Sequence, residues 1–204
     1  MTNKEKMLSG NLYLANDPEL KKMFRNARKL LNKFNKTHLS NFDKRRKIAK
    51  KLFGSLGENA VINSPIYVDY GKNIYIGNNF YANFTLTLLD VNKITIGNNV
   101  MFGPNVSIYT AGHPIDKDVR NTGLEFGHSV TIGDNVWIGG SVVINPGVSI
   151  GNNVIIGAGS VVTKDIKDDC IAFGNPAKVY RKINDEDKIF WENEKEKYYN
   201  SIIK

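Results

Sequence analysis

The chain has 204 residues, enough for one sizeable domain with an appendage but too few for two ordinary enzyme domains. Hydrophobic residues make up 41% and charged residues 24%, a globular composition that excludes global disorder, collagen and a coiled coil. The single Cys170 excludes an internal disulfide, a four-thiolate zinc site and a CxxC redox pair.

The charge distribution and the absence of long apolar runs limit the partners. No run reaches the roughly 18 apolar residues of a membrane span, and residues 1–10 alternate charge and polarity where a signal peptide is apolar. We therefore expect a cytoplasmic protein without a membrane partner. The net charge is +8, and residues 1–53 alone carry 15 basic and 4 acidic side chains. Without a nucleic-acid-binding motif, we interpret this excess as the solvated face of basic helices and expect no nucleic-acid partner.

The first 57 residues are typical of a helical hairpin. Asp17 before Pro18 predicts an N-cap with proline in the first turn. Apolar residues then recur at helical spacing, at Leu20, Met23, Phe24, Ala27, Leu30, Leu31 and Phe34. Ser40 is predicted to cap a second helix that ends at Gly54 and Gly57. One face of that helix would carry Phe42, Arg45, Ala49, Leu52 and Phe53.

From Val130 onward the sequence has a period of six. Successive hexads start at Val130, Val136, Val142, Val148, Val154 and Ser160. Two residues later stand Ile132, Ile138, Ile144, Ile150, Ile156 and Val162, followed by Gly133, Gly139, Asn145, Gly151, Gly157 and Thr163. A helix cannot generate this period, whereas a short strand followed by a turn with Gly or Asn at positive φ can. Because no hexad can bury its face alone, the pattern predicts stacked coils of a parallel β-helix.

The same signature extends upstream, with one irregular spacing and one long interruption. It recurs at residues 74–77, 94–97, 100–103 and 106–108. Its spacing is irregular after Gly77, and it breaks for 18 residues between Ala111 and Val130. That break contains two of the three histidines, and long insertions in compact repeats are usually functional or disordered. We expect a β-helix domain over residues 58–183, with function concentrated in an extruded loop at 112–129.

Residues 184–204 are predicted to form a C-terminal helix. Acidic residues 185–187 suit the first turn of a helix because they face its positive dipole end. Apolar residues follow at Ile189, Phe190, Trp191, Tyr198, Tyr199, Ile202 and Ile203. An isolated helix of this length is marginal, so we expect it to pack on the coil or on a neighbouring subunit.

Several motifs carry a family resemblance over roughly residues 1–183. They are Gly10–Tyr13, Tyr70-Gly71, Asn78–Phe84, Gly112–Pro114, Ile144–Val148, Gly157–Asp165 and Gly174–Ala177. Together they resemble the maltose and galactoside acetyltransferase group of the hexapeptide-repeat acyltransferases. The resemblance implies a mainly β fold, a left-handed parallel β-helix, with acetyl-CoA as co-substrate and no required metal. It also implies a homotrimer whose sites lie between subunits.

The resemblance implies direct transfer of acetyl from coenzyme A to a hydroxyl, which requires a base. A neutral histidine can take the hydroxyl proton, an effect worth roughly 10²–10⁴-fold. His113, in a Gly-His-Pro context at the start of the loop, is the candidate general base. A structural hydrogen bond is the alternative for His113 and the preferred interpretation of His38 and His128. A covalent acyl-enzyme through Cys170 is rejected because no histidine lies near it in sequence.

The resemblance also assigns residues to the acceptor, a sugar or similar small hydroxyl compound. They are Asp17, Asp69, Asn83 and Glu125. Galactoside-type enzymes carry serine where Asp69 stands, so acceptor selectivity is left open. The alternatives are an N-cap role for Asp17, a turn role for Asn83 and a solvated loop position for Glu125. Glu125 could also orient His113 or balance its positive charge. Trp137 could form a wall of the site for the acceptor or for the pantetheine arm.

Coenzyme A has three phosphate groups and a long arm, which a straight β-helix edge can accommodate. By family position its contacts are Gly140, Ala158, Thr163, Lys164, Lys178 and Arg181. The two small residues leave backbone groups accessible, and the cations suit the phosphates. The alternative for each cation is an ordinary surface position. The family often has arginine where Lys178 stands, so a bidentate grip would be weakened.

Three other functions are alternatives at this level. The first is a non-catalytic trimeric scaffold or carbohydrate-binding protein. A β-helix carbonic anhydrase would need three histidine ligands for zinc, and the third would have to be His38. Nucleic-acid binding through the basic hairpin would show steep salt dependence.

Overall fold

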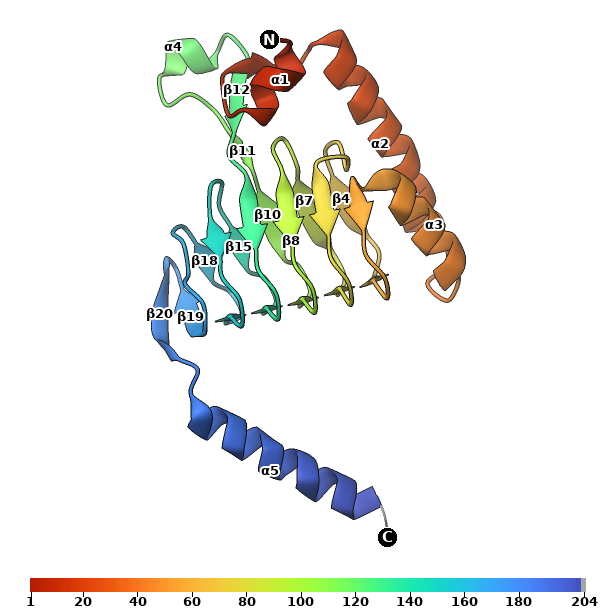
Figure 1. Ribbon diagram of the computed structural model, residues 1–204. Helices are drawn as coiled ribbons and strands as arrows, with labels where there is room; N and C mark the ends of the chain where they lie inside the picture. Colours follow the sequence, from red (N-terminus) through yellow and green to blue (C-terminus); the bar gives the residue numbers. More distant parts are fainter. Residues whose placement is uncertain (203–204) are drawn as a thin grey trace.

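The computed structural model describes residues 1–202 and shows a parallel β-helix with helices at both ends of the chain (Figure 1). The β-helix has three faces. Each face is a sheet of parallel strands, and neighbouring strands in it belong to successive coils, that is, to successive turns of the β-helix. Face 1 comprises β2 (Ser55–Leu56), β5 (Ile74–Ile76), β8 (Ile94–Ile96), β13 (Val130–Ile132) and β16 (Ser149–Ile150). Face 2 comprises β3 (Val61–Ile62), β6 (Tyr81–Ala82), β9 (Met101–Phe102), β14 (Trp137–Ile138), β17 (Ile155–Ile156), β19 (Cys170–Gly174) and the antiparallel β20 (Ala177–Lys182). Face 3 comprises β4 (Ile66–Val68), β7 (Leu86–Leu89), β10 (Ser107–Tyr109), β15 (Val143–Ile144) and β18 (Val161–Val162).

The inside of the coil is filled by the aliphatic residues of the hexads. Each hexad contributes its first residue and the residue two positions later, and these side chains are buried from Val130 to Val162. Upstream, Phe80 and Phe102 stack edge to face on successive coils, with ring centroids 5.1 Å apart. The predicted β-helix is therefore confirmed, because only stacking buries these side chains.

Side chains of Asn and Asp hold the corner between face 1 and face 2. In this corner, which we call the ladder corner, Asn79 donates to Asn99 (2.8 Å) and Asn99 to Asn135 (3.1 Å). The backbone of these three residues has φ of 56°, 56° and 58°. Asn tolerates this left-handed conformation better than other residues with a Cβ.

The glycines of the ladder corner have a different task from the one predicted. The positive φ lies two residues after each of them, on Asn, so the turn does not depend on glycine freedom. A Cβ on Gly133 would stand 2.6 Å from Oδ1 of Asn152 and 2.8 Å from the carbonyl carbon of Gly151 in the next coil. Glycine is required there because adjacent coils approach too closely for a side chain.

The coil changes its length at the corner between face 3 and face 1, which we call the site corner. Strand partners lie 20 residues apart in the first coils, as for Ile74 and Ile94, and 18 apart later, as for Thr131 and Ser149. The extra residues of the longer coils lie in segments 69–73 and 89–93, between face 3 and face 1. This accounts for the irregular spacing after Gly77.

The 18-residue insertion leaves the coil at the same corner and is more ordered than an extruded loop. It contains β11 (Ala111–Gly112), the short helix α4 (Lys117–Arg120) and β12 (Leu124–Gly127). β11 and β12 pair antiparallel, with Gly112 opposite Phe126. We call this segment the inserted hairpin. Sequence reasoning missed its strands because their register is set by pairing within the insertion, outside the hexad repeat.

Helices α2 (Pro18–Lys36) and α3 (Phe42–Leu52) cover the N-terminal end of the coil, as Figure 1 shows. Asp17 caps α2 as predicted, accepting from the backbone of Glu19 (2.8 Å). Asn41 rather than Ser40 caps α3, because the Ser40 hydroxyl lies 2.8 Å from Nδ1 of His38. Phe42, predicted to share a helix face with Arg45, Ala49, Leu52 and Phe53, is 66% exposed at the first position of its helix, whereas the other four are buried.

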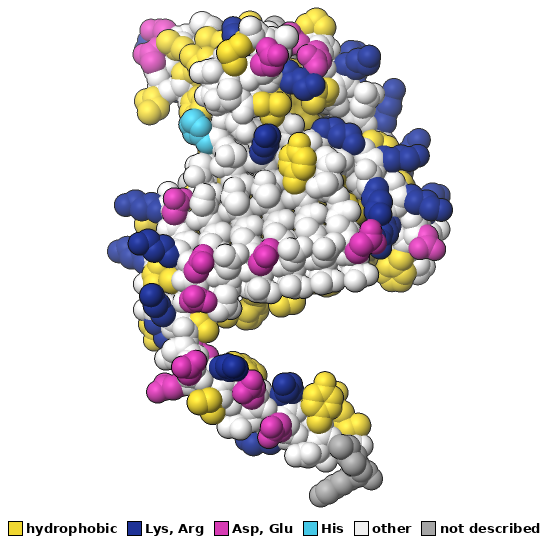
Figure 2. Space-filling view, in the orientation of Figure 1, with side chains coloured by type: hydrophobic (Ala, Val, Ile, Leu, Met, Phe, Trp, Pro, Cys, Tyr) yellow, Lys and Arg dark blue, Asp and Glu magenta, His cyan; other side chains and the backbone are white. Residues whose placement is uncertain are grey.

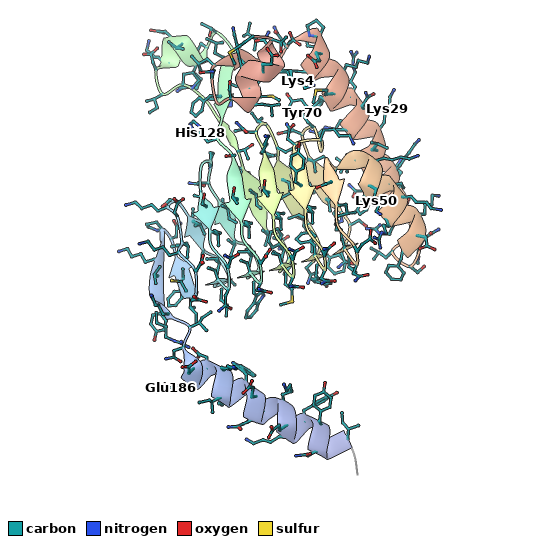
Figure 3. All side chains as sticks on the ribbon, in the orientation of Figure 1. Lys4, Lys29, Lys50, Tyr70, His128 and Glu186 are labelled. Carbon is teal, nitrogen blue, oxygen red and sulfur yellow. The ribbon has the colours of Figure 1, made fainter. Side chains whose placement is uncertain are left out.

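Arg45 fastens this helical hairpin to the first coil. The residue is 5% exposed, and its guanidinium donates to the carbonyls of Thr37 (2.9 Å) and Ile62 (2.8 Å). It also lies 4.2 Å from the centroid of the Phe34 ring. The opposite sides of α2 and α3 carry much of the basic excess, and Figure 2 shows Lys and Arg gathered there. Lys29 and Lys50 point outward (Figure 3).

A short N-terminal segment that the sequence did not reveal lies over the site corner. It contains α1 (Asn3–Leu8) and β1 (Tyr13–Leu14). α1 begins with a capping box in which Thr2 and Glu5 exchange hydrogen bonds. β1 pairs antiparallel with β12 of the inserted hairpin, so residues 13–14 add a third strand to the sheet of β11 and β12.

The C-terminal helix α5 (Asp185–Ile202) projects away from the coil (Figure 1). Its large apolar side chains are exposed, Trp191 by 67%. Arg181 of β20 holds its first turn through a two-point ion pair with Asp187, at 2.6 and 2.7 Å. α5 therefore does not pack on its own coil, and residues 203–204 of the predicted helix lie outside the described residues. Within residues 1–202, no helix combines the length and apolarity needed to cross a membrane.

Candidate active site

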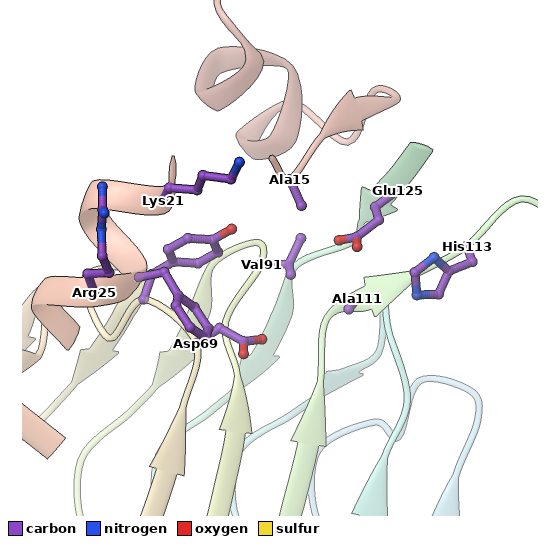
Figure 4. A pocket seen from close by; sticks show the side chains of 10 residues that line it. Ala15, Lys21, Arg25, Asp69, Val91, Ala111, His113 and Glu125 are labelled. Atoms are coloured by element: carbon purple, nitrogen blue, oxygen red, sulfur yellow. The ribbon is translucent and has the colours of Figure 1, made fainter. Parts of the chain in front are cut away.

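A cavity of about 500 Å³ opens at the site corner, between the coil, α2, the N-terminal segment and the inserted hairpin (Figure 4). Its lining residues are Ala15, Lys21, Phe24, Arg25, Asp69, Tyr70, Val91, Ala111, His113 and Glu125. Three of the predicted site residues, His113, Asp69 and Glu125, thus line one cavity. They come from the coil and the inserted hairpin.

His113 follows β11 directly, at the base of the inserted hairpin. Gly112 before it packs against the Phe126 ring, where a Cβ would come within 2.7 Å of ring carbons. The base is further fixed by Thr110, whose hydroxyl donates to the Leu89 carbonyl (2.7 Å) and accepts from the Asn92 backbone (2.8 Å). The imidazole is therefore carried on an anchored strand end at the edge of the cavity.

Asp90, a fully buried carboxylate, shapes the coil segment that carries Asp69 and Tyr70. Its Oδ1 accepts from the backbone N–H groups of Asp69 (3.0 Å) and Tyr70 (2.9 Å). Its Oδ2 accepts from the backbone N–H of Asn73 (3.2 Å). Burial raises the pKa of Asp90 to about 7, although these N–H donors act in the opposite direction.

Asp69 and Glu125 bring two carboxylates to the same cavity. Burial raises the pKa of Asp69, and the negative charge of Glu125 acts in the same direction. The Arg28 guanidinium, with Nη2 3.7 Å from Oδ1 of Asp69, opposes this rise. Burial, followed by the charges of Asp69 and Glu125, raises the pKa of Tyr70 to about 12, so its phenol is a hydrogen-bond donor at neutral pH.

Glu125 is half-buried and held from the N-terminal segment. The hydroxyl of Tyr13 donates to Oε2 of Glu125 at 2.7 Å. Burial, with the hydrogen bond to Glu125 as a second cause, raises the pKa of Tyr13, so this phenol stays protonated. Lys21 and Arg25, both exposed on α2, stand at the opposite side of the cavity.

Two predicted acceptor residues lie outside the cavity of a single protomer. Asp17 caps α2 and accepts from the side chain of Asn3 (3.1 Å), while Ala15 lines the cavity nearby. Asn83 lies at the corner between face 2 and face 3, which we call the third corner, and accepts from the backbone of Phe84 (2.8 Å). The geometry therefore groups Asn83 with neither His113 nor Glu125.

The predicted coenzyme A residues are spread along the coil. Gly140 and Ala158 lie on the third corner, on successive coils, and Thr163 and Lys164 lie beyond β18 near the C-terminal end. Lys178 and Arg181 are exposed on β20. Arg181 is engaged with Asp187, an ion pair that lowers the pKa of this carboxyl to about 2. Trp137 is half-exposed on face 2.

Sequence reasoning missed four polar residues that shape the cavity. They are Tyr13, Arg28, Tyr70 and Asp90. The Tyr70-Gly71 motif and the irregular spacing after Gly77 were signals for the site corner, but the partners of Tyr13 and Arg28 are remote in sequence. Glu125 lies 112 residues from Tyr13.

The remaining histidines and the cysteine lie apart from this chemistry. His38 contacts Ser40 between α2 and α3. The His128 ring lies 5.2 Å from the Phe126 ring, centroid to centroid. Cys170 is buried, with its Sγ 3.3 Å from the carbonyl of Asp168. Among the described residues, no three His, Cys, Asp or Glu side chains gather closely enough to hold a metal ion.

Two family models match the chain. Residues 6–57 match the maltose acetyltransferase hexapeptide capping motif, and residues 129–164 match the bacterial transferase hexapeptide model of six repeats. The first range spans most of the N-terminal segment with α2 and α3, and the second spans the strict hexad repeat.

Curated and solved relatives cover nearly the whole chain. The galactoside O-acetyltransferase of Escherichia coli is 45% identical over 187 residues, 92% of each chain. The crystal structure of a maltose O-acetyltransferase from Clostridium difficile matches with a TM-score of 0.89 and 55% identity, over 90% of this chain and 98% of that one. A galactoside acetyltransferase solved in complex with coenzyme A matches with a TM-score of 0.88 and 44% identity, over 92% and 94%.

Proposed function

The chain belongs to the maltose and galactoside acetyltransferase group of the hexapeptide-repeat family and is an acetyl-CoA-dependent O-acetyltransferase, and from this premise we propose that it acetylates a hydroxyl of a sugar or similar small acceptor with His113 as general base. The observation that carries the proposal is the cavity at the site corner. It brings His113 together with the carboxylates of Asp69 and Glu125 at the only long interruption of the described coil. Family membership favours this activity over a non-catalytic scaffold.

In the proposed reaction, His113 accepts the proton of the acceptor hydroxyl as the hydroxyl oxygen attacks the thioester carbonyl carbon. The carbon–sulfur bond then breaks, and the proton passes from His113 to the departing sulfur. The products are the acetyl ester and free coenzyme A. No side chain is acetylated, consistent with the burial of Cys170 away from the cavity. The acceptor binds by donating hydroxyl hydrogen bonds to Asp69 and Glu125, because ionised carboxylates only accept.

The coenzyme A site is proposed along the coil from the third corner to β20. Gly140 and Ala158 fit an extended ligand because residues this small leave backbone groups accessible. Adjacent turns also meet closely there, since a Cβ on Gly139 would lie 2.6 Å from the backbone nitrogen of Ala158. Thr163 and Lys164 would meet the arm or the phosphates, and Lys178 and Arg181 the nucleotide end. Arg181 would have to share its guanidinium with Asp187.

We further propose a homotrimer in which Asn83 of one protomer faces His113 of the next. Asn83 lies at the third corner of one turn and His113 leaves the site corner of the following turn, on a different side of the β-helix, so a shared site requires two protomers. Face 2 supports an interface because its outward column is apolar and 39–52% exposed. The column consists of Val61, Tyr81, Met101 and Trp137 in register. The exposed aromatic residues of α5 need a partner for the same reason.

Thiol release from acetyl-CoA across a panel of sugars, amino sugars and simple alcohols tests the acceptor class. We expect turnover with one or more sugars and ester formation by mass spectrometry. An amide product, or turnover confined to non-carbohydrate alcohols, would contradict the sugar hydroxyl as acceptor.

Subunit complementation tests the shared site. His113→Ala and Asn83→Ala proteins are each expected to be weakly active as trimers, as measured by light scattering. Unfolding and refolding the two together forms mixed trimers, in which some interfaces pair an intact His113 with an intact Asn83. Recovered activity supports the proposal, whereas mixed trimers that remain inactive would contradict a site shared between protomers.

A further inference from the structure

The pairing of β1 with β12 places Tyr13 directly opposite Glu125, and the Tyr13 hydroxyl donates to Oε2 at 2.7 Å. We propose that Tyr13 is a positioning residue for the acceptor, because its phenol holds the Glu125 carboxylate in the orientation that receives an acceptor hydroxyl. This inference rests on the proposed function. It extends the site to the N-terminal segment, 112 residues away in sequence from the carboxylate that it holds.

The phenol is fixed firmly enough to act as a positioning group. Tyr13 is 1% exposed and packs in a small core beneath the N-terminal segment. The other buried members of that core are Met7, Leu20, Tyr70 and Val91. Strand β1 is itself tied to α1, because the backbone N–H of Leu14 donates to Oδ1 of Asn3 (3.1 Å). The hydroxyl thus reaches Glu125 from a packed, hydrogen-bonded support.

Glu125 needs such a hydrogen-bond partner, because its surroundings fix its side chain less than a fully packed core would. It lies on a four-residue strand of the inserted hairpin and is only half-buried. Its neighbour in the cavity is the carboxylate of Asp69, and like charges repel one another. A charge-assisted hydrogen bond from a rigid donor restricts the rotamers of Glu125 at little entropic cost. Figure 4 shows the Glu125 carboxylate in the cavity, and because Tyr13 contacts Oε2, the other carboxylate oxygen is left for the acceptor.

The arrangement also indicates the class of acceptor. Asp69 and a fixed Glu125 provide acceptor atoms at two places in one cavity, which suits a polyhydroxylated ring that donates from two hydroxyls. A monohydric alcohol can satisfy only one of them. The hydrogen bond from Tyr13 should therefore contribute to the preference for sugars over simple alcohols, and removing it should weaken that preference.

Steady-state kinetics of Tyr13→Phe test this role, because the substitution removes only the hydroxyl. We expect the KM for the best sugar acceptor to rise roughly tenfold, while kcat and the KM for acetyl-CoA stay within about twofold. The KM for a monohydric alcohol should change little. In a Glu125→Ala background the same substitution should have almost no further effect. Tyr75→Phe, on the outside of face 1, is the matched control for loss of a phenol hydroxyl.

The outcomes separate positioning from a structural role and from failure of the proposed function. An unchanged sugar KM in Tyr13→Phe, an equal loss with and without Glu125, or a loss that follows the melting temperature and affects both substrates would each overturn the inference. A wild-type protein that acetylates no hydroxyl compound would contradict the proposed function, and the inference with it. Wild-type turnover with unaltered Tyr13→Phe kinetics would contradict the inference alone.

Discussion

The ladder corner and the site corner of the β-helix differ in how regular their turns are. At the ladder corner, each described coil turns with nearly the same geometry, and side chains of Asn79, Asn99 and Asn135 bond from coil to coil. At the site corner, the first coils carry extra residues, and an 18-residue insertion interrupts the repeat between Ala111 and Val130. One corner fixes the distance between coils, and the other lets backbone leave the coil.

The difference shows how a repeat protein gains a site without losing its core. A residue inserted at the ladder corner would break hydrogen bonds on both neighbouring coils, because each Asn is donor and acceptor in the same column. Residues inserted at the site corner extend outward, and the buried aliphatic columns of the three faces keep their register on either side. The proposed site therefore lies where the repeat tolerates irregularity.

The largest expected effect separates the two corners by activity. His113→Ala should lower turnover roughly 10²- to 10⁴-fold, because the hydroxyl loses its base, while coenzyme A affinity, trimer size and melting temperature stay close to those of the wild type. Assays of thiol release measure turnover, and calorimetry measures coenzyme A affinity and melting temperature. Near-normal turnover of His113→Ala with a good acceptor would contradict the proposal that the active site lies at this corner.

Asp90 allows the site corner to be tested through pH. The folded protein holds this proton up to a pKa of about 7, whereas an unperturbed carboxyl releases it near 3.8. The folded state therefore binds more protons than the unfolded chain between these values, and the free energy of unfolding should fall as pH rises from about 4 to 7. Asp90→Asn removes this contribution, so its stability relative to the wild type should improve by about 3 kcal/mol across that window.

Urea unfolding of both proteins at several pH values between 4 and 8 measures this difference. Asn cannot accept all three backbone N–H bonds, so Asp90→Asn should be less stable than the wild type by an amount that does not depend on pH. The change in the stability difference between pH values is therefore the quantity to compare. Parallel pH profiles of the two proteins would show that Asp90 does not carry the effect.

The ladder corner should respond in stability alone. Gly133→Ala forces a Cβ against Asn152 and the backbone of Gly151 in the next coil, so we expect a loss of roughly 1–3 kcal/mol in the free energy of unfolding. At temperatures where the variant is folded, kcat and both KM values should be unchanged. Thr95→Ala, on an exposed strand position, is the control and should melt like the wild type. A kinetic change without a stability change would contradict the separation of the two corners.

The smallest expected effect concerns the cations at the end of the coil. Lys178→Ala should weaken coenzyme A binding roughly fivefold, with a smaller effect on the dephospho form, because the lysine is proposed to contact a phosphate. Arg181→Ala should have a comparable effect on binding and should also release the first turn of α5, since Asp187 loses its partner. Calorimetry with both ligands, and limited proteolysis for α5, distinguish the two variants. Equal coenzyme A affinities for the wild type and both variants would contradict the placement of the nucleotide end of coenzyme A at β20.

The sequence by itself determined the β-helix, because a strict period of six aliphatic residues has no other way to bury its side chains. It also led to the proposed site, since the break in that period contains His113, and the family resemblance supplied the expected chemistry. The helices α2 and α3 were readable from caps and apolar spacing, which are local signals. Asn41 replaced Ser40 as the cap because Ser40 already contacts His38.

Only the tertiary structure decided which side chains meet at the cavity. Tyr13 reaches Glu125, Arg28 reaches Asp69 and Asp90 gathers the backbone of segment 69–73 through contacts between segments that are distant in sequence. No local propensity encodes such contacts, because each depends on the register of β1 with β12 or on the stacking of successive coils. The tertiary structure likewise gave the glycines of the ladder corner their role. They are needed for the close approach of the next coil, while Asn adopts the left-handed turn.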